Sequence, residues 1–389
     1  MSRKQQIRFL KALTMLNASN KGLILPFFPL FLYYRGFSSF EIGLILGIAP
    51  MVSIVAQPFF GFISDKYKTI KGLLILLYFC VIAVSFSIFF VGDFFIVFCS
   101  FILFHFVMSP TMPLLDSMAI KSLGKRNRGQ YGKIRLWGSV GFATTAIISG
   151  PILDWVGISR IYLLFWILIL LFISLALFLK DDNHSADPVT LNGLKTIIQN
   201  KPFMLFLSLC FLVMVPHRMN DTMLVLHLEG LGATTFLVGL AWALAAFSEV
   251  PVFYFLTAKI MQFNHLFLLG CVAFFYTIRW MLYGFIESAE WIVFLQISQS
   301  ITFGLFWLVA LQTAVHFIPN HLRSTGQAIL TSTCFGLGGA AGGSIGGSIL
   351  ENYGSDIMYH MMAIVTFVAM IGIFLKYKKS KDLEIVERS

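Results

Sequence analysis

The sequence predicts an all-α membrane protein with twelve transmembrane helices in two halves of six. The first observation is composition: 58% of the 389 residues are hydrophobic and only 12% are charged, about half the charged share of a typical soluble domain. The second is a series of apolar runs, each long enough for the roughly 20 residues that cross a bilayer. The third is one long polar insert near the middle of the chain, residues 181–201.

Twelve apolar segments have the required length, and the short connections between them leave no room for a soluble domain. The first segment contains Lys21, and no small-residue cleavage site is evident, so we expect a retained helix rather than a signal peptide. The expected division is an N-terminal half at 1–180, a cytoplasmic linker at 181–201, a C-terminal half at 202–376 and a cytoplasmic tail at 377–389. The predicted spans are residues 9–34, 40–64, 72–92, 94–120, 131–156, 159–180, 202–226, 234–258, 264–286, 289–317, 324–350 and 356–376.

The distribution of positive charge indicates the orientation of these spans. Of the 28 Lys and Arg residues, 22 lie in the N-terminal tail, the connections that follow even-numbered spans and the C-terminal tail, or in the span ends that border them. Only Arg35 and Arg160 lie in the opposite connections. Because Lys and Arg stay on the cytoplasmic side, we expect both termini in the cytoplasm and a multi-pass protein of the cell (plasma) membrane. The net charge of +10 then reflects topology and contact with anionic lipid, and nucleic acid is not expected as a partner.

Ionisable side chains within the predicted spans are the strongest candidates for function. A charge at this depth is costly unless it is paired or faces a polar cavity. Arg218 and Asp221, three residues apart on one helical face, can pair with each other, and His217 lies beside them. Two interpretations remain open: proton coupling with substrate contact, or structural ion pairs that hold the bundle together. The acids are Asp116, Asp221 and Glu249, and the bases are Lys21, Arg135, Arg218 and Arg279.

Motifs for catalysis, metal binding or ATP binding are absent from the sequence. It contains no GxSxG, HExxH or P-loop pattern, each of which would place reactive groups at a known spacing. The five cysteines lie in apolar stretches without a CxxC pair, where cysteine behaves as a small hydrophobic side chain. We therefore expect no enzyme activity, no metal and no cofactor, with the proton gradient as the driving force.

The end of the second predicted span carries a recognisable pattern, 57-QPFFGFISDK-66. A Gly, three residues, an Asp and a basic residue at this place resemble the signature of the major facilitator superfamily, here Gly61, Asp65 and Lys66. The resemblance implies that these three residues form a cytoplasmic gate. Further stretches are similar to the branch that contains lactose permease, nucleoside–proton symporters and the phenylpropionate permease; they include 113-PLLDSMA-119, 131-YGKIRLWGSVGF-142 and 276-YTIRW-280.

The branch resemblance implies roles for individual residues. Arg135 matches the arginine that binds sugar hydroxyls, Asp116 lies within a residue of its acidic partner, and Arg279 matches the arginine of the proton site. Phe142 replaces a tryptophan that stacks on sugar, and Gln299 stands where the branch usually carries a histidine. The expected proton-coupling residues are Asp116, Glu249, Arg279, Asp221 and Arg218. The expected substrate-binding residues are Arg135, Trp137, Phe142, Gln299 and Lys21.

The resemblance also implies a major facilitator fold that works by alternating access, as a monomer in a bacterial cytoplasmic membrane. The expected function is proton-driven uptake of a small organic solute such as a sugar, nucleoside or aromatic acid, with Glu249 and Arg279 forming a pair. Two alternatives remain open. An efflux antiporter is one, because Gly150–Pro151 partly matches the glycine signature of that class. A membrane receptor that keeps the fold without transporting is the other.

Overall fold

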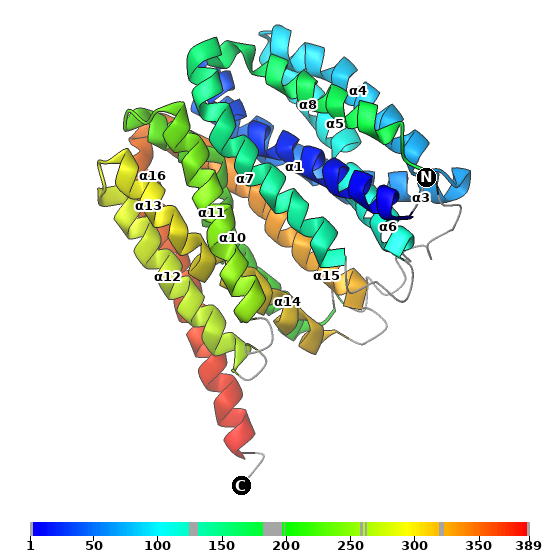
Figure 1. Ribbon diagram of the computed structural model, residues 1–389. Coiled ribbons are helices and arrows are strands. Elements are labelled where there is room, and N and C mark those ends of the chain that lie inside the picture. Colours follow the sequence, from blue (N-terminus) through cyan, green and yellow to red (C-terminus); the bar gives the residue numbers. More distant parts are fainter. Residues whose placement is uncertain are drawn as a thin grey trace.

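The computed structural model describes residues 3–123, 131–181, 197, 199–256, 260, 263–318 and 323–386. Within these ranges the regular structure is helical throughout. Ten helical segments are long and apolar enough to cross a membrane, and the helices group into two bundles (Figure 1). The predicted all-α membrane fold is confirmed, whereas most of the predicted linker at 181–201 lies outside the described residues.

The N-terminal bundle has helices at every span predicted before residue 180. Capping side chains explain where some helices begin: Ser38 forms a capping box at the start of α2, and Asp93 accepts a hydrogen bond from Ile96 N at 2.9 Å at the start of α5. Pro50 and Pro110 lie where the helices are interrupted, since proline has no backbone N–H to donate to the helix. These interruptions were not predicted from the sequence. The elements are α1 (Arg3–Tyr34), α2 (Ser39–Ile48), the 3-10 turn Ala49–Val52, α3 (Ser53–Tyr67), α4 (Lys71–Phe90), α5 (Phe94–Met108), α6 (Thr111–Leu123), α7 (Tyr131–Val156), the 3-10 turn Ile158–Arg160 and α8 (Ile161–Ala176).

The C-terminal bundle also has helices at its predicted spans, but with more irregular turns. The predicted spans at 289–317 and 324–350 each contain a π turn, and Gly354 breaks α16 with a positive φ of 84° that glycine tolerates. The elements are α10 (Lys201–Gly230), α11 (Thr235–Phe255), α12 (His265–Phe285), α13 (Ala289–Leu295), the 3-10 turn Gln296–Gln299, the π turn Ser300–Gly304, α14 (Leu305–Phe317), α15 (Arg323–Thr331), the π turn Ser332–Leu337 and α16 (Gly338–Val386).

The two bundles meet along a contact between α2 and α16 that is made by glycines. A Cβ atom placed on Gly43 would lie 2.1 Å from the carbonyl oxygen of Gly343, and one placed on Gly47 would lie 2.6 Å from that of Gly339. Both distances are far below van der Waals contact, so no larger residue fits without moving a helix. Glycines of this kind allow helix backbones to approach closely within a membrane. We call this contact the α2–α16 seam.

A second close contact between the bundles joins α7 and α11. A Cβ atom on Gly239 would lie 2.0 Å from the carbonyl oxygen of Ala146, and one on Gly150 would lie 2.7 Å from that of Thr235. The Thr235 hydroxyl also donates a hydrogen bond to Gly150 O at 2.6 Å. We call this contact the α7–α11 seam. Together the two seams hold the bundles backbone against backbone.

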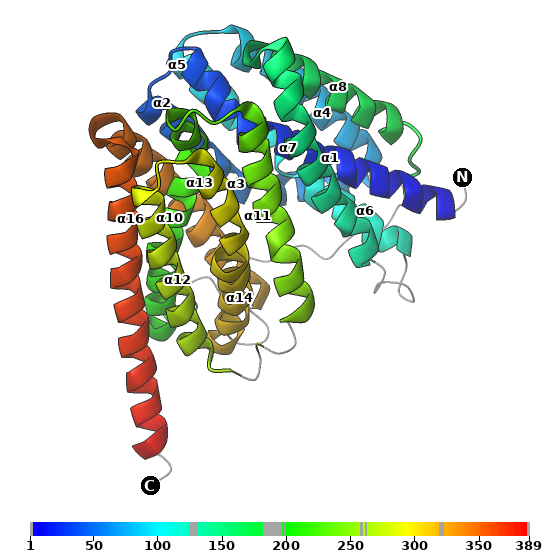
Figure 2. The same ribbon diagram turned by 60° about the vertical axis from the view of Figure 1, so that its left-hand side comes forward.

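Polar contacts reinforce the same end of the molecule. The Glu351 carboxylate on α16 accepts a hydrogen bond at 2.9 Å from Phe40 N, in the first turn of α2, where a negative charge complements the helix dipole. The hydroxyl of Tyr34, at the end of α1, donates to the carboxylate of Glu229 near the end of α10. Away from this end the bundles diverge, and the chain termini lie far apart in both views (Figures 1 and 2).

Candidate substrate and proton site

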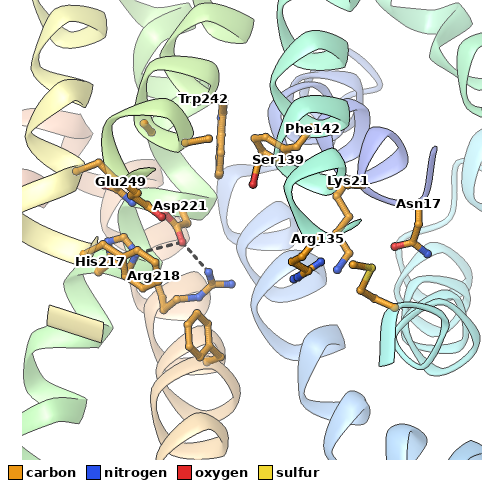
Figure 3. A pocket seen from close by; sticks show the side chains of 18 residues that line it. Asn17, Lys21, Arg135, Ser139, Phe142, His217, Arg218, Asp221, Trp242 and Glu249 are labelled. Carbon is orange, nitrogen blue, oxygen red and sulfur yellow. Dashed lines mark hydrogen bonds and ion pairs between the residues drawn. The ribbon is translucent and has the colours of Figure 1, made fainter. Parts of the chain in front are cut away.

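A cavity of about 400 Å³ lies between the two bundles. Helices from both halves contribute to it, and its charged side chains face one another across the space (Figure 3). This volume is in the range of pockets that hold small organic ligands. The lining residues are Asn17, Ala18, Lys21, Met112, Arg135, Gly138, Ser139, Phe142, His217, Arg218, Asp221, Trp242, Ala245, Ala246, Glu249, Gln299, Phe303 and Phe335.

The N-terminal wall of the cavity is formed chiefly by α1 and α7. These helices pack tightly, since a Cβ atom on Gly22 would lie 2.3 Å from the carbonyl oxygen of Phe142. The contact brings Lys21 of α1 and Arg135 of α7 to the same wall, and both point into the cavity (Figure 3). Asn17 is held in place because its amide donates to Tyr78 OH at 2.9 Å and to a second hydroxyl, on α6, at 2.7 Å.

The C-terminal wall carries an ion pair on α10. Arg218 Nη1 donates to Asp221 Oδ2 at 2.6 Å, and His217 Nε2 lies 3.6 Å from the same oxygen. The His217 ring is buried and stacks on Phe303, with ring centroids 4.6 Å apart. The Arg218 guanidinium lies 5.6 Å from the ring centroid of Phe335. The predicted pairing of Arg218 with Asp221 is therefore present, and it faces the cavity.

Arg279 lies behind this wall and is surrounded by neutral oxygen atoms. Its side chain is 2% exposed, and it donates to Gln299 Oε1 at 2.6 Å, Gln296 Oε1 at 2.7 Å and Thr302 Oγ1 at 2.9 Å. The 3-10 turn at Gln296–Gln299 explains this arrangement, because residues three apart eclipse each other in a 3-10 helix and so present both glutamines to the same guanidinium.

The predicted direct pair between Glu249 and Arg279 is wrong. Among the described residues, ion pairs within 4.0 Å are formed by Asp221 with Arg218 and with His217. Glu249 instead interacts with the side-chain amide of Gln299, whose carbonyl oxygen accepts from Arg279. Gln299 therefore bridges the two charges, with the amide oxygen facing the arginine and the amide nitrogen free to face the carboxylate. The sequence could not reveal this bridge because its residues lie on three different segments of the chain, and Gln299 belongs to a 3-10 turn that the sequence did not predict.

Most predicted site residues line the cavity, but Trp137 does not. It lies two residues after Arg135, about 200° around α7, and its side chain is 40% exposed away from the cavity. The prediction that it binds substrate is corrected for this conformation. Trp242 on α11 was missed; it lines the cavity opposite Phe142, with ring centroids 6.3 Å apart. The signal in the sequence that could have revealed this residue was its position, as a tryptophan in the first half of the eighth predicted span.

Asp116 and the predicted gate lie outside the cavity lining. Asp116 forms a hydrogen bond with Tyr131 and acts electrostatically on Lys21 without an ion pair between them. The predicted gate residues Gly61, Asp65 and Lys66 occupy the last two turns of α3.

The turn after α3 is fixed by a residue from the end of the N-terminal bundle. The carboxylate of Asp181 accepts hydrogen bonds from the backbone N–H groups of Ile70 and Lys71, each at 2.9 Å, and from the hydroxyl of Thr69 at 2.5 Å. These N–H groups begin α4, so Asp181 caps that helix from another part of the chain. The α3–α4 turn is thereby joined to the residue where the linker begins.

The fold is that of a helical membrane protein with a cavity between two bundles. The chain belongs to the MFS_1 like family, which it matches over residues 8–361. The predicted membership of the major facilitator superfamily is confirmed, and the protein is a multi-pass membrane transporter rather than an enzyme.

Relatives of known name span nearly the whole chain. The maltose permease of Geobacillus stearothermophilus is 28% identical over 365 residues, covering 92% of each chain. The probable 3-phenylpropionic acid transporter of Escherichia coli is 22% identical over 355 residues, covering 90% of this chain and 92% of its own. The crystal structure of the nucleoside transporter NupG has a TM-score of 0.84 at 16% identity, covering 97% of this chain and 100% of that one. This last likeness supports the fold.

Proposed function

We propose that the protein takes up a small organic solute together with protons by alternating access. In this proposal twelve helices span a bacterial cytoplasmic membrane in two halves, 1–180 and 202–376, with the linker at 181–201 and the tail at 377–389 in the cytoplasm. The excess of Lys and Arg near both termini supports this orientation. The protein works as a monomer without a cofactor, driven by the proton gradient.

The observation that carries the proposal is the cavity between the bundles, which has ionisable side chains from both halves in its walls. A solute held there contacts both bundles at once, so its binding depends on how the bundles are arranged. In the proposed orientation the two seams close the outer end, and the described conformation is inward-facing. Separation of the seams would open the cavity to the outside, as alternating access requires.

Glu249 is the first candidate for the proton carrier. Its side chain faces the cavity, and the polar group with which it interacts is the neutral amide of Gln299. Asp221 is a weaker candidate, because its ion pair with Arg218 would have to break before a proton could bind. Asp116 is the third candidate; it stands behind the N-terminal wall. Protonation of Glu249 would be transmitted through Gln299 to the buried Arg279.

Substrate contact is proposed for Lys21, Arg135, Phe142, Gln299 and, in place of Trp137, for Trp242. The aromatic rings of Phe142 and Trp242 offer flat apolar faces on opposite walls, and rings of this kind stack on planar or cyclic solutes.

The α3–α4 turn is proposed as the cytoplasmic gate. Asp65→Ala should slow transport while leaving the affinity for substrate added from outside largely unchanged; normal turnover in that variant would reject the gate.

Proteoliposomes with an imposed pH gradient separate symport from its alternatives. Radiolabelled maltose, uridine and 3-phenylpropionate serve as probes, and solute and proton fluxes are followed together. Movement in the same direction supports the proposal, movement in opposite directions identifies an antiporter, and binding without counterflow identifies a receptor.

A carboxyl variant then tests the proposed proton carrier in the same vesicles. Glu249→Gln should lose uphill accumulation but keep counterflow, because a neutral side chain cannot release a proton. Glu287→Gln removes an exposed carboxyl outside the cavity and should behave as the wild type. Uphill accumulation by Glu249→Gln would exclude Glu249 as the carrier.

A further inference from the structure

A second cavity, of about 340 Å³, adjoins the first on the N-terminal side. Lys21, Arg218, Asp221 and Trp242 line both cavities, so these residues stand at the boundary between the two spaces. We call the second space the side cavity. Its position means that a solute bound beside Lys21 has room to extend away from the C-terminal wall.

The side cavity has large apolar surfaces away from the charged boundary. One surface comes from α5 and the other from α1 and the junction of α2 with α3 (residues 46–57). Apolar surface that faces open space favours an apolar occupant, because burial of such surface removes it from water. The apolar lining residues are Ile24, Leu25, Pro29, Leu46, Pro50, Phe101, Phe104 and Met108.

The charges at the boundary leave one positive charge without compensation. Arg218 is paired with Asp221, and Arg279 is linked to Glu249 through Gln299. These two sets are each neutral when their acids are ionised. Neither set therefore compensates the positive charges of the N-terminal wall.

Two cations share that wall with one acid. Among the described residues, neither Lys21 nor Arg135 forms a hydrogen bond or an ion pair with another side chain within 4.0 Å. Asp116 is the carboxylate that acts on Lys21, and it is already hydrogen-bonded to Tyr131. Charges at membrane depth are normally balanced by a partner, so the wall lacks one negative charge.

We propose that the substrate is an amphipathic monocarboxylate, with its carboxylate between Lys21 and Arg135 and its apolar tail in the side cavity. The inference rests on the proposed transport function and names its substrate class. One carboxylate neutralises the surplus charge, and Arg and Lys both donate strong charge-assisted hydrogen bonds to it. A neutral sugar would leave the surplus charge uncompensated and would place hydroxyls against the apolar walls.

Equilibrium binding of matched probes to the purified protein tests the carboxylate site. The probes are 3-phenylpropionate and its neutral analogue 3-phenylpropanamide, which have nearly the same shape; at pH 7 the acid is ionised. The acid should bind about 10- to 100-fold more tightly than the amide, the range expected for a charge-assisted contact. Lys21→Met should remove most of this preference, and Lys21→Arg should keep it. Lys4→Met makes the same change on an exposed turn of the same helix and should have no effect.

The side cavity is tested by the length of the tail. Phenylacetate, 3-phenylpropionate and 4-phenylbutyrate should bind with affinities that rise about fourfold per added methylene, the factor expected when a CH₂ group is buried. Leu46→Trp fills the side cavity and should abolish this rise while leaving phenylacetate binding within about threefold. If Leu46→Trp does not fold, the series on the wild-type protein decides alone.

The outcomes separate this inference from the proposed transport function. Equal affinity for acid and amide, or an unchanged preference in Lys21→Met, overturns the carboxylate site. Affinity that is independent of tail length overturns the role of the side cavity. A clear acid preference in a protein that shows no proton-driven uptake supports the inference and counts against proton symport.

Discussion

Replacement of Gly343 by alanine should open the end of the molecule that the two seams close, which is the outer end in the proposed orientation. A Cβ atom at this position would lie 2.4 Å from the carbonyl oxygen of Gly43 and 2.8 Å from the Cα atom of Gly47. The first distance is about 1 Å short of the 3.4 Å at which ordinary contact begins. Both contacts are with backbone, so a side chain cannot rotate away, and α2 and α16 must separate. Overpacking of this kind costs about 1–3 kcal/mol, which would shift the conformational equilibrium by about 5- to 150-fold.

The accessibility of a cavity residue measures this shift. Ser139→Cys places a thiol in the cavity wall, and its labelling by a membrane-impermeant maleimide is compared from the two sides of the membrane. Gly343→Ala should raise labelling from the outside and lower it from the inside. Gly132→Ala is the matched control, because a Cβ atom there meets nothing within 4 Å. An unchanged labelling ratio in a Gly343→Ala protein with normal melting would refute the role of the seam in closing the outer end.

Three further predictions concern single contacts. Gln299→Leu removes the bridge to Arg279 at a cost of about 1–3 kcal/mol, and vesicle assays should show lost proton-driven accumulation with counterflow retained; unchanged accumulation would mean that the bridge is not part of coupling. Asp221→Asn strands the Arg218 charge and should lower thermal stability by about 3 kcal/mol, whereas the double variant with Arg218→Gln should recover most of it; additive losses would argue against the pair. Asp181→Ala removes the cap of α4 and should cost about 1 kcal/mol in thermal unfolding, with no loss expected if the cap is not formed.

The positions of the helices were predictable because hydrophobic length is a strong signal in membrane proteins. The interruptions within spans were harder to predict. The π turns at Ser300–Gly304 and Ser332–Leu337 contain no proline, and their sequences resemble ordinary helix. Such turns depend on tertiary contacts, which apolar composition does not encode.

The candidate site was predictable as a set of charges but not as a set of contacts. Lys21, Arg135 and Glu249 could be found because ionisable groups are rare within spans. The partner of Glu249 could not, because Gln299 reaches it only through the local distortion of its helix. Trp137 was misassigned because the motif was carried over as a stretch, whereas a helix presents only residues three or four apart to one face.

The glycine seams affect how quickly the two bundles can separate at the end that the seams close. Side chains that interlock across an interface must leave their rotamers before the two surfaces separate, and each such step adds to the barrier. At Gly47 and Gly343 the facing groups are backbone atoms, which have no rotamers to change. The glycine contacts can therefore separate without a change of rotamer, and the barrier that remains comes from the wetting of the two faces and from the hydrogen bonds that join the bundles at this end. A closed end of this construction combines a tight seal against solute leakage with low mechanical resistance to opening.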